Sequence, residues 1–492
     1  MTRCPRWILL TLFFLLPGTF SVASSAIPVL ERNALIALYT ATGGSRWSDN
    51  SGWKTPPLAA DGFAMPGTEC SWYGVGCYEN RVTALEFIDN QLTGSMPAEL
   101  GDFANLQVLE LWVNQLTGSI PAELGHLSLL EYLNLGDNGL TGSIPPALKN
   151  LSRLQTLSLY SNRLSGGIPS ELGALANLQG MFLMDNQLSG GIPPELGNLS
   201  GLKRLELYFN QLTGSIPPQL KNLAGLEYLD LSLNQLSGSI PAELGDLSNL
   251  ESLLLTGNAL AASIPPELGN LTRLERLELN ANQLGGSIPA ELGDLSNLES
   301  LLLTGNALTG SIPPELGNLT RLERLELNAN QLGGSIPPEL GGLASLHYLE
   351  LSSNQLDGSI PPELGGLASL QNLLLSANQL SGSIPAELGD LSNLQSLHLQ
   401  YNQLSGNIPA ELGRLANLGV LWLLSNRLAG SIPPELINLN SLFFLRICEN
   451  HLYTDNETLR QFLNDLEPDW ESCQTPLPAV SLPFLNILLL DD

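Results

Sequence analysis

An asparagine returns every 24 residues along most of this chain, and no insertion breaks the interval. The series begins at Asn90 and ends at Asn450. A fixed period of roughly 20 to 50 residues is typical of a solenoid, in which each repeat contacts only its neighbours. We therefore predict one elongated domain over residues 82–450, although 492 residues would ordinarily suggest about three domains.

Apolar residues surround each asparagine at fixed distances. Around Asn282 they are Leu274, Leu277, Leu279 and Leu284. In the segment RLELN the leucines alternate with polar residues, which indicates a short strand with one buried face. Because the return segments have nearly constant length, successive strands should lie parallel and share a continuous leucine core. The predicted fold class is an α/β solenoid of sixteen 24-residue repeats with a cap at each end.

Asparagine, glycine and proline have separate predicted roles where the chain leaves the strand. The asparagine amide both donates and accepts hydrogen bonds, so it can pair backbone groups left free by the turn. An apolar replacement would leave those groups unsatisfied at roughly 1 to 3 kcal/mol. Glycine four residues later, as at Gly286, permits a positive φ, and Ala262 in repeat eight should be a local strain. Proline, as at Pro289, fixes the direction of the return.

Residues 1–26 have the three parts of a secretory signal peptide. Arg3 and Arg6 precede the apolar run WILLTLFFLL, and small residues follow, so cleavage is expected after Ala23 or Ala26. The run is about half of the roughly 20 residues needed to span a bilayer. The tail over residues 477–492 is short and contains proline. We expect a secreted or cell-surface protein that is not an integral membrane protein once processed.

The segments that flank the repeats, residues 27–81 and 451–476, are expected to be caps. Thr454 and Glu457 have the spacing of a helix capping box. The apolar residues that follow at helical spacing are Leu459, Phe462, Leu463, Leu466 and Trp470. This segment is interpreted as a lid on the last coil, because an uncapped solenoid exposes its core.

Four cysteines would remain after processing: Cys70, Cys77, Cys448 and Cys473. They allow three pairings. Sixteen strands stacked at about 4.8 Å would place the ends roughly 70 Å apart, whereas bridged Cα atoms lie within about 7 Å. The predicted disulfides are therefore Cys70–Cys77 and Cys448–Cys473, which suit an oxidising compartment.

The formal net charge of −28 argues against nucleic acid as a partner, since phosphate binding needs a basic face. Much of the acidity comes from glutamates nine residues after the asparagine, such as Glu243 and Glu291. A repeated charge at that position keeps a long solenoid soluble.

The unit LxxLxLxxNxLxGxIPxxLGxL, present from Leu274 to Leu295, resembles the plant-type leucine-rich repeat. CSWYGVGC, from Cys70 to Cys77, is similar to the N-terminal cap pattern of that family. The resemblance covers about three quarters of the chain, residues 82–450. It implies a curved right-handed superhelix with a parallel sheet inside and mostly 3₁₀ or extended segments outside. Similar arrays form receptor ectodomains and secreted enzyme inhibitors.

Function must lie in the positions that the fold leaves free, namely six, four, two and one residues before each asparagine. Large side chains fill these positions in the early and late repeats, and they are the candidate ligand-binding residues of the concave face: Trp112, Tyr132, Tyr160, Phe182, Met184, Tyr208, Phe209, Tyr228, His398, Tyr401, Trp422 and Phe444. Clustered exposed aromatics on a concave surface are common anchors of protein interfaces. The alternative is that they only stabilise the sheet by cross-strand contact.

One column of these candidates contains Trp112, Tyr160 and Tyr208 on alternate strands. Strand spacing separates them by about 9.6 Å, with Gly136 and Met184 between. They are interpreted as separate anchor points rather than as one stack.

The middle of the array is duplicated. Residues 241–289 and 289–337 differ only at Ala261 against Thr309 and Ala262 against Gly310. Because even surface positions agree, we expect a spacer or modular surface here rather than the specific site. Arg276 and Glu278 should form a solvated ion pair of little individual weight.

Catalysis finds no support in the sequence. His126, His347, His398 and His451 are scattered, with no matching nucleophile or carboxylate. Three aspartates share a column, Asp89, Asp137 and Asp185, but they lie on alternate strands, too far apart to ligate one metal. We expect no enzyme activity, no metal and no cofactor.

Three functions remain, and the first is recognition of an extracellular protein or peptide on the concave face. Carbohydrate or cell-wall binding, or adhesion, is the alternative, because aromatic rings also stack on sugars. Ice binding is a distant third. Thr256 and Thr304 alternate with Asn280 and Asn328, which makes a poor hydroxyl lattice.

Overall fold

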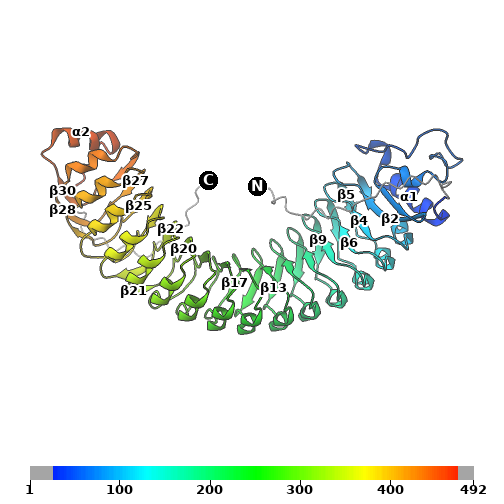
Figure 1. Ribbon diagram of the computed structural model, residues 1–492, viewed down its shortest axis with the longest axis horizontal. Helices are drawn as coiled ribbons and strands as arrows, with labels where there is room; N and C mark the ends of the chain where they lie inside the picture. The colour runs from blue at the N-terminus through cyan, green and yellow to red at the C-terminus, as the bar shows by residue number, and fades with distance from the viewer. Residues whose placement is uncertain (1–25, 475–492) are drawn as a thin grey trace.

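Each turn of the chain adds one short strand to a long sheet on the concave side of an arc (Figure 1). The computed structural model describes residues 26–474. The predicted signal peptide up to residue 25, residues 475–476 of the predicted cap and the tail 477–492 lie outside the described residues. Within the described part, no helix is long and apolar enough to cross a membrane.

The concave sheet has 17 strands. The first pair, β1 with β2, is antiparallel, and the later strands pair in parallel in chain order. The strands are β1 (Val75–Tyr78), β2 (Arg81–Glu86), β4 (Val108–Glu110), β6 (Tyr132–Asn134), β8 (Thr156–Ser158), β10 (Gly180–Phe182), β12 (Arg204–Glu206), β14 (Tyr228–Asp230), β16 (Ser252–Leu254), β18 (Arg276–Glu278), β19 (Ser300–Leu302), β20 (Arg324–Glu326), β22 (Tyr348–Glu350), β24 (Asn372–Leu374), β25 (Ser396–His398), β27 (Val420–Trp422) and β29 (Phe444–Arg446).

A second set of short strands follows the asparagine turns, and these strands also pair in parallel. The longest of these sheets contains β3 (Thr93–Ser95), β5 (Gln115–Gly118), β7 (Gly139–Gly142), β9 (Arg163–Gly166), β11 (Gln187–Gly190), β13 (Gln211–Gly214), β15 (Gln235–Gly238) and β17 (Ala259–Leu260). Two smaller sheets contain β21 (Gly333–Ser335) and β23 (Gln355–Asp357), then β26 (Ser405–Gly406), β28 (Arg427–Ser431) and β30 (His451–Tyr453).

The convex side carries one 3₁₀ helix per repeat (Figure 1). Proline precedes each of these helices in extended conformation, as Pro289 does with φ −65° and ψ 135°. The helices are η3 (Ala98–Asp102), η4 (Ala122–His126), η5 (Pro146–Asn150), η6 (Ser170–Ala174), η7 (Pro194–Asn198), η8 (Pro218–Asn222), η9 (Ala242–Asp246), η10 (Pro266–Asn270), η11 (Ala290–Asp294), η12 (Pro314–Asn318), η13 (Pro338–Gly342), η14 (Pro362–Gly366), η15 (Ala386–Asp390), η16 (Ala410–Arg414) and η17 (Pro434–Asn438).

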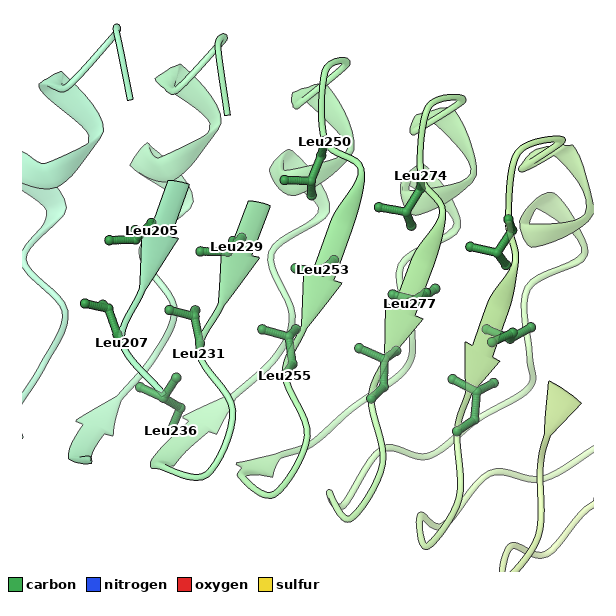
Figure 2. Packing of buried hydrophobic residues seen from close by; sticks show 14 of the residues in the cluster. Leu205, Leu207, Leu229, Leu231, Leu236, Leu250, Leu253, Leu255, Leu274 and Leu277 are labelled. Atoms are coloured by element: carbon green, nitrogen blue, oxygen red, sulfur yellow. The ribbon is translucent and has the colours of Figure 1, made fainter. Parts of the chain in front are cut away.

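The core is a set of leucine columns that run along the whole solenoid. Leu205, Leu229, Leu253 and Leu277 follow one another on successive strands and are fully buried (Figure 2). Register between these strands never shifts, so equivalent positions of neighbouring repeats lie side by side. The predicted α/β solenoid with a parallel inner sheet is therefore confirmed.

The asparagines form a hydrogen-bonded ladder inside the turns. Asn282 Nδ2 donates to the carbonyl of Leu255 at 2.9 Å and to that of Leu279 at 3.1 Å, while Asn282 Oδ1 accepts from the N–H of Leu260 at 3.1 Å. Each side chain thus joins its own turn to the preceding repeat, as predicted. The predicted strain at Ala262 is also present, because its φ is +66°.

The N-terminal cap covers the first repeat with α1 (Val29–Ala41) and two 3₁₀ turns, η1 (Gly44–Arg46) and η2 (Glu69–Ser71). Trp53 and Trp72 are buried with ring centroids 4.7 Å apart. Asn90 Oδ1 accepts from the N–H of Asp49 at 2.6 Å, and Asn90 Nδ2 donates to the carbonyl of Asp49 at 2.9 Å. The cap therefore supplies the backbone groups that a preceding repeat would offer.

The C-terminal cap contains α2 (Glu457–Leu466), whose buried face includes Leu459 and Leu463. The predicted capping box is wrong. Asn456 is the N-cap and its Oδ1 accepts from the N–H of Leu459 at 3.0 Å, whereas Thr454 Oγ1 accepts from the N–H of Asn456 before the helix. Asparagine satisfies a free helix N–H as well as threonine does, so the helix begins later than the spacing indicated.

Both predicted disulfides are present. The Cα atoms of Cys70 and Cys77 are 5.5 Å apart, and those of Cys448 and Cys473 are 5.2 Å apart. Each bridge lies within one cap, so neither links the ends of the array.

Gln474 ends the asparagine ladder at the next 24-residue position after Asn450. Its Oε1 accepts from the N–H of Leu452 at 3.1 Å, and its Nε2 donates to the carbonyls of Ile447 at 3.1 Å and Trp470 at 2.7 Å. The bonds with Leu452 and Ile447 are those that the asparagine of one more repeat would make, whereas the bond to Trp470 replaces one to the residue three places before the asparagine.

We predict that Gln474→Ala lowers the free energy of unfolding of the C-terminal cap by roughly 1 to 3 kcal/mol, because it leaves backbone groups unpaired. Hydrogen exchange at the Leu452 amide should speed up accordingly. Gln461→Ala on the exposed side of α2 is the control, since its Nε2 contacts only Asp465 among the bonds observed. Equal exchange in both variants would contradict this role of Gln474.

Candidate functional site

The candidate residues fall into two groups on the concave sheet. The N-terminal aromatic cluster comprises Trp112, Tyr132, Tyr160, Phe182, Tyr208, Phe209 and Tyr228, and the C-terminal aromatic cluster comprises His398, Tyr401, Trp422 and Phe444. They are held by β4 to β14 and by β25 to β29, respectively, or by the residues that directly follow these strands. The two clusters are separated by the duplicated repeats.

Within the N-terminal aromatic cluster, Phe209 is 56% exposed and Tyr132 is 37% exposed, while the other members are half-buried. Met184 is only 6% exposed. The interpretation of Met184 as a ligand-binding residue is therefore corrected, because its side chain offers almost no surface.

Glycines on the strands give two of these rings a place to lie. A Cβ atom at Gly136 would meet the Tyr160 ring at 2.4 Å, and one at Gly180 would meet the Phe182 ring at 2.6 Å. The rings of Tyr160 and Phe182 therefore lie close against the backbone at Gly136 and Gly180, respectively. The Tyr160 ring occupies the space beside Gly136, the residue that separates Trp112 from Tyr160 in the column two residues before the asparagine.

The position directly before each asparagine is not a free position, contrary to the sequence analysis. Residues there adopt a left-handed backbone, with φ +54° at Phe209, +53° at Leu233 and +59° at Tyr401. This conformation costs a residue other than glycine roughly 1 to 2 kcal/mol. Each duplicated unit has glycine at one of its two such positions, Gly257 or Gly305, and alanine at the other, Ala281 or Ala329.

Phe209, Leu233 and Tyr401 gain little burial in return for this strain, since they are 56%, 50% and 54% exposed. Leu233 was missed from the sequence because leucine appeared unremarkable among so many. Large exposed side chains held at strained backbone positions are typical of functional surfaces.

Carboxylates recur in the column four residues before the asparagine, and all but Glu278 come in pairs on adjacent strands. Register places Glu86 beside Glu110 and Glu206 beside Asp230. Glu326 and Glu350 form a third pair. The signal for these pairs is present in the sequence, because acidic residues recur four places before the asparagine in consecutive repeats.

One carboxyl of each pair has a raised pKa, namely that of Glu110, Asp230 or Glu350. Burial, and then the charge of Glu86, raises the pKa of Glu110. Burial raises the pKa of Asp230 to about 6, helped by Glu206 and Glu278 and opposed by hydrogen bonds from Ser232. The concave face therefore holds negative charge that a cationic group would stabilise.

Arginines neutralise part of this column. Arg204 donates to Glu206 at 2.8 Å, and its guanidinium lies 4.3 Å from the centroid of the Tyr228 ring. Arg276 pairs with Glu278 at 2.5 Å, with about half of the arginine side chain exposed, as expected of a solvated pair. Asp230 has no such cation among the ion pairs of the described residues.

In the C-terminal aromatic cluster, the rings of His398 and Trp422 are stacked, with centroids 4.3 Å apart and planes inclined by 14°. Burial lowers the pKa of His398 to about 4, so the imidazole is neutral at physiological pH. Tyr401 and Phe444 are more than half exposed. Within residues 26–474, no group of histidine, cysteine and carboxylate side chains could hold a metal ion.

The fold thus defines a class of repeat proteins that display variable side chains on one continuous concave sheet. Models of the leucine-rich repeat family match residues 77–218 and 214–339 (leucine-rich repeat region), 320–380 and 393–415 (leucine-rich repeat). The chain belongs to the leucine-rich repeat family. No curated protein matches it in sequence.

Solved structures of related proteins cover most of the chain. The plant peptide hormone receptor RGFR1, in complex with RGF2, is 37% identical over 74% of this chain and 66% of its own, with a TM-score of 0.66. The ectodomain of the Arabidopsis thaliana receptor kinase GASSHO1/SCHENGEN3, in complex with CASPARIAN STRIP INTEGRITY FACTOR 2, is 36% identical. The match covers 81% of this chain and 55% of that ectodomain, with a TM-score of 0.60. The Leptospira interrogans protein LIC12759 is 31% identical over 87% of this chain and 94% of its own length, with a TM-score of 0.60.

The chain spans about two thirds and about half of the length of the two plant proteins. It is thus related to leucine-rich repeat ectodomains that bind peptide hormones.

Proposed function

We propose that this protein is an extracellular recognition module that binds a peptide, or an extended segment of a protein, along its concave face. The observation that carries the proposal is the pair of exposed aromatic side chains at left-handed positions, Phe209 and Tyr401. Glycine adopts this backbone conformation at the least cost, as at Gly257, and other repeats place small residues there, such as Ala281 and Ser353. Retaining an aromatic ring suggests that the ring contacts a ligand.

The chemistry of the face favours a peptide with basic residues. Aromatic rings supply apolar anchors for its side chains. Paired carboxylates on the same face, such as Glu86 and Glu110, would stabilise arginine or lysine. Related receptors were solved with peptide hormones bound, which supports the same class of ligand.

A secreted or cell-surface location fits this role. Two disulfides form within the caps, and such bridges persist in oxidising compartments. The expected signal peptide agrees with that location.

Phe209→Gly separates binding from stability. Peptides selected from a phage-displayed random library on the full chain should bind this variant at least about tenfold more weakly, since an anchor contributes roughly 2 kcal/mol. Its free energy of unfolding should stay the same or rise by up to about 1 kcal/mol, because strain is relieved. Calorimetric titration and urea unfolding would measure the two effects.

Ala281→Gly is the matched control, because Ala281 has φ +51° at the same position of a duplicated repeat and carries no ring. Its peptide affinity should be unchanged. If Phe209→Gly binds the selected peptides as tightly as the native chain, the proposed function of this face is wrong. Selection of glycans but not peptides by the native chain would favour the carbohydrate alternative instead.

A further inference from the structure

Three buried side-chain polar atoms lack a hydrogen-bond partner among the described residues: Thr256 Oγ1, Gln400 Oε1 and Trp422 Nε1. Gln400 and Trp422 lie in neighbouring repeats of the C-terminal aromatic cluster, whereas Thr256 lies alone in the duplicated middle. Leaving one such group unpaired costs roughly 1 to 3 kcal/mol. Two of them in one place need an explanation.

The sheet register places these two side chains close together. His398 on β25 pairs with Trp422 on β27, and Gln400 is two residues beyond His398 on the same face. Gln400 and Trp422 are therefore diagonal neighbours, about 7 to 8 Å apart at the backbone. Gln400 is only 8% exposed.

Two leucines lie near these atoms, and neither of the atoms has a hydrogen-bond partner among the described residues. Leu374 lies beside His398 on the preceding strand, and Leu424 follows Trp422 by two residues on the same face. The imidazole of His398 covers one face of the indole. The imidazole is neutral at physiological pH, and on the other side of Trp422 the register of β27 with β29 places the charged Arg446 beside it.

The unpaired atoms define the chemistry of a complementary group. Gln400 Oε1 accepts a hydrogen bond and Trp422 Nε1 donates one. A carboxylate cannot donate and an ammonium group cannot accept, so neither satisfies both atoms. A secondary amide does, because its N–H and C=O point in opposite directions and can bridge two side chains that face each other across it.

We propose that Gln400 and Trp422 form a subsite that binds a backbone amide of an extended peptide. This inference rests on the proposed function and names what the C-terminal aromatic cluster recognises. Neighbouring side chains cover both atoms, so the subsite opens when a side chain of this surface rotates. The two bonds formed with the ligand then satisfy groups that are unpaired in the free protein.

A sugar hydroxyl could also donate and accept. Sugars bind proteins mostly by stacking on open aromatic faces, and one face of Trp422 is already occupied by His398. The stacking of His398 on Trp422 therefore favours a peptide amide over a sugar as the ligand. The experiment tests a sugar separately.

The test uses the full chain with ¹⁵N-labelled tryptophan side chains, and the probe is N-acetylglycine N′-methylamide, which contains only secondary amides. The indole resonance of Trp422 is assigned by its loss in Trp422→Phe. We expect a saturable downfield shift of this resonance, and apparent binding at least about tenfold weaker in Gln400→Leu. Gln400→Leu should also have a higher melting temperature, because the unpaired acceptor is gone.

Gln395→Leu is the matched control, since Gln395 is exposed in the same repeat. It should leave both the saturable shift and the melting temperature unchanged. If Gln400→Leu proves poorly folded, Gln400→Met keeps the side-chain length and should show the same loss of binding.

A shift that stays linear with probe concentration, or that saturates equally in the Gln400 variants, would overturn the subsite. A lower melting temperature in both folded Gln400 variants would overturn it as well, because the carboxamide would then have a partner. Saturation by methyl glucoside but not by the amide would assign the site to a sugar. Loss of peptide binding in Phe209→Gly together with failure of the amide probe would remove this inference alone and leave the proposed function standing.

Discussion

Asn282→Leu should lower the free energy of unfolding by roughly 3 to 5 kcal/mol, the largest effect expected from one substitution in this chain. The change keeps the side-chain size but removes an acceptor for the N–H of Leu260 and donors to the carbonyls of Leu255 and Leu279. Each buried group left unpaired costs roughly 1 to 3 kcal/mol. Urea unfolding followed by circular dichroism would measure the loss.

The duplication provides an internal replicate and a control. Asn330 makes the same bonds in the second copy, to Leu303, Leu327 and the N–H of Leu308. Asn330→Leu should therefore lower the free energy of unfolding by the same amount as Asn282→Leu within error. Gln283→Leu, on the exposed side of the turn, should lower it little. A small loss in both asparagine variants would show that the ladder does not stabilise the solenoid.

Asp230→Asn should raise the free energy of unfolding at pH 7 by roughly 1 to 3 kcal/mol. The pKa of Asp230 is about 6 in the folded protein against an ordinary value of 3.8. Between these values the folded chain holds a proton that the unfolded chain has released, so native stability falls as the pH rises through this window. Asparagine keeps the carbonyl that accepts from the N–H of Ser232 and removes the charge.

The pH dependence of this gain is the difference in free energy of unfolding between Asp230→Asn and the native chain, measured at each pH. His398 has the opposite effect, because its pKa is lowered from 6.5 to about 4 and native stability rises with pH between those values. The gain in Asp230→Asn should grow from near zero at pH 4 to its full value at pH 7. Glu243→Gln, on exposed η9, is the control. A gain independent of pH would contradict the raised pKa.

The repeating framework could be predicted from the sequence because its determinants are local and recur at one interval. Leu277 and Asn282 have the same environment as their counterparts in every repeat, so one assignment predicts all of them. The caps were less predictable. Gln474 extends the ladder with a different amide, and Asn456 caps α2 where Thr454 had been expected to.

The candidate site could be predicted only in part, because residue type alone does not report backbone conformation or side-chain burial. Phe209 and Asp89 share a left-handed backbone, but the variety of residues at their position concealed the constraint. Met184 was expected to be exposed because its position in the repeat faces the concave side, yet it is only 6% exposed. The unpaired atoms of Gln400 and Trp422 depend on side-chain packing, which no spacing in the sequence reports.

The central claim is that the concave face binds a peptide, and photo-cross-linking tests it most directly. A selected peptide carrying benzophenone at one end or the other would be irradiated with the full chain, and the linked residues identified by mass spectrometry. We predict cross-links to the concave face, at or next to Tyr132, Phe209 and Leu233 for one end of the peptide and farther along the same face for the other. Cross-links confined to the convex 3₁₀ helices or to the second set of strands would contradict the account.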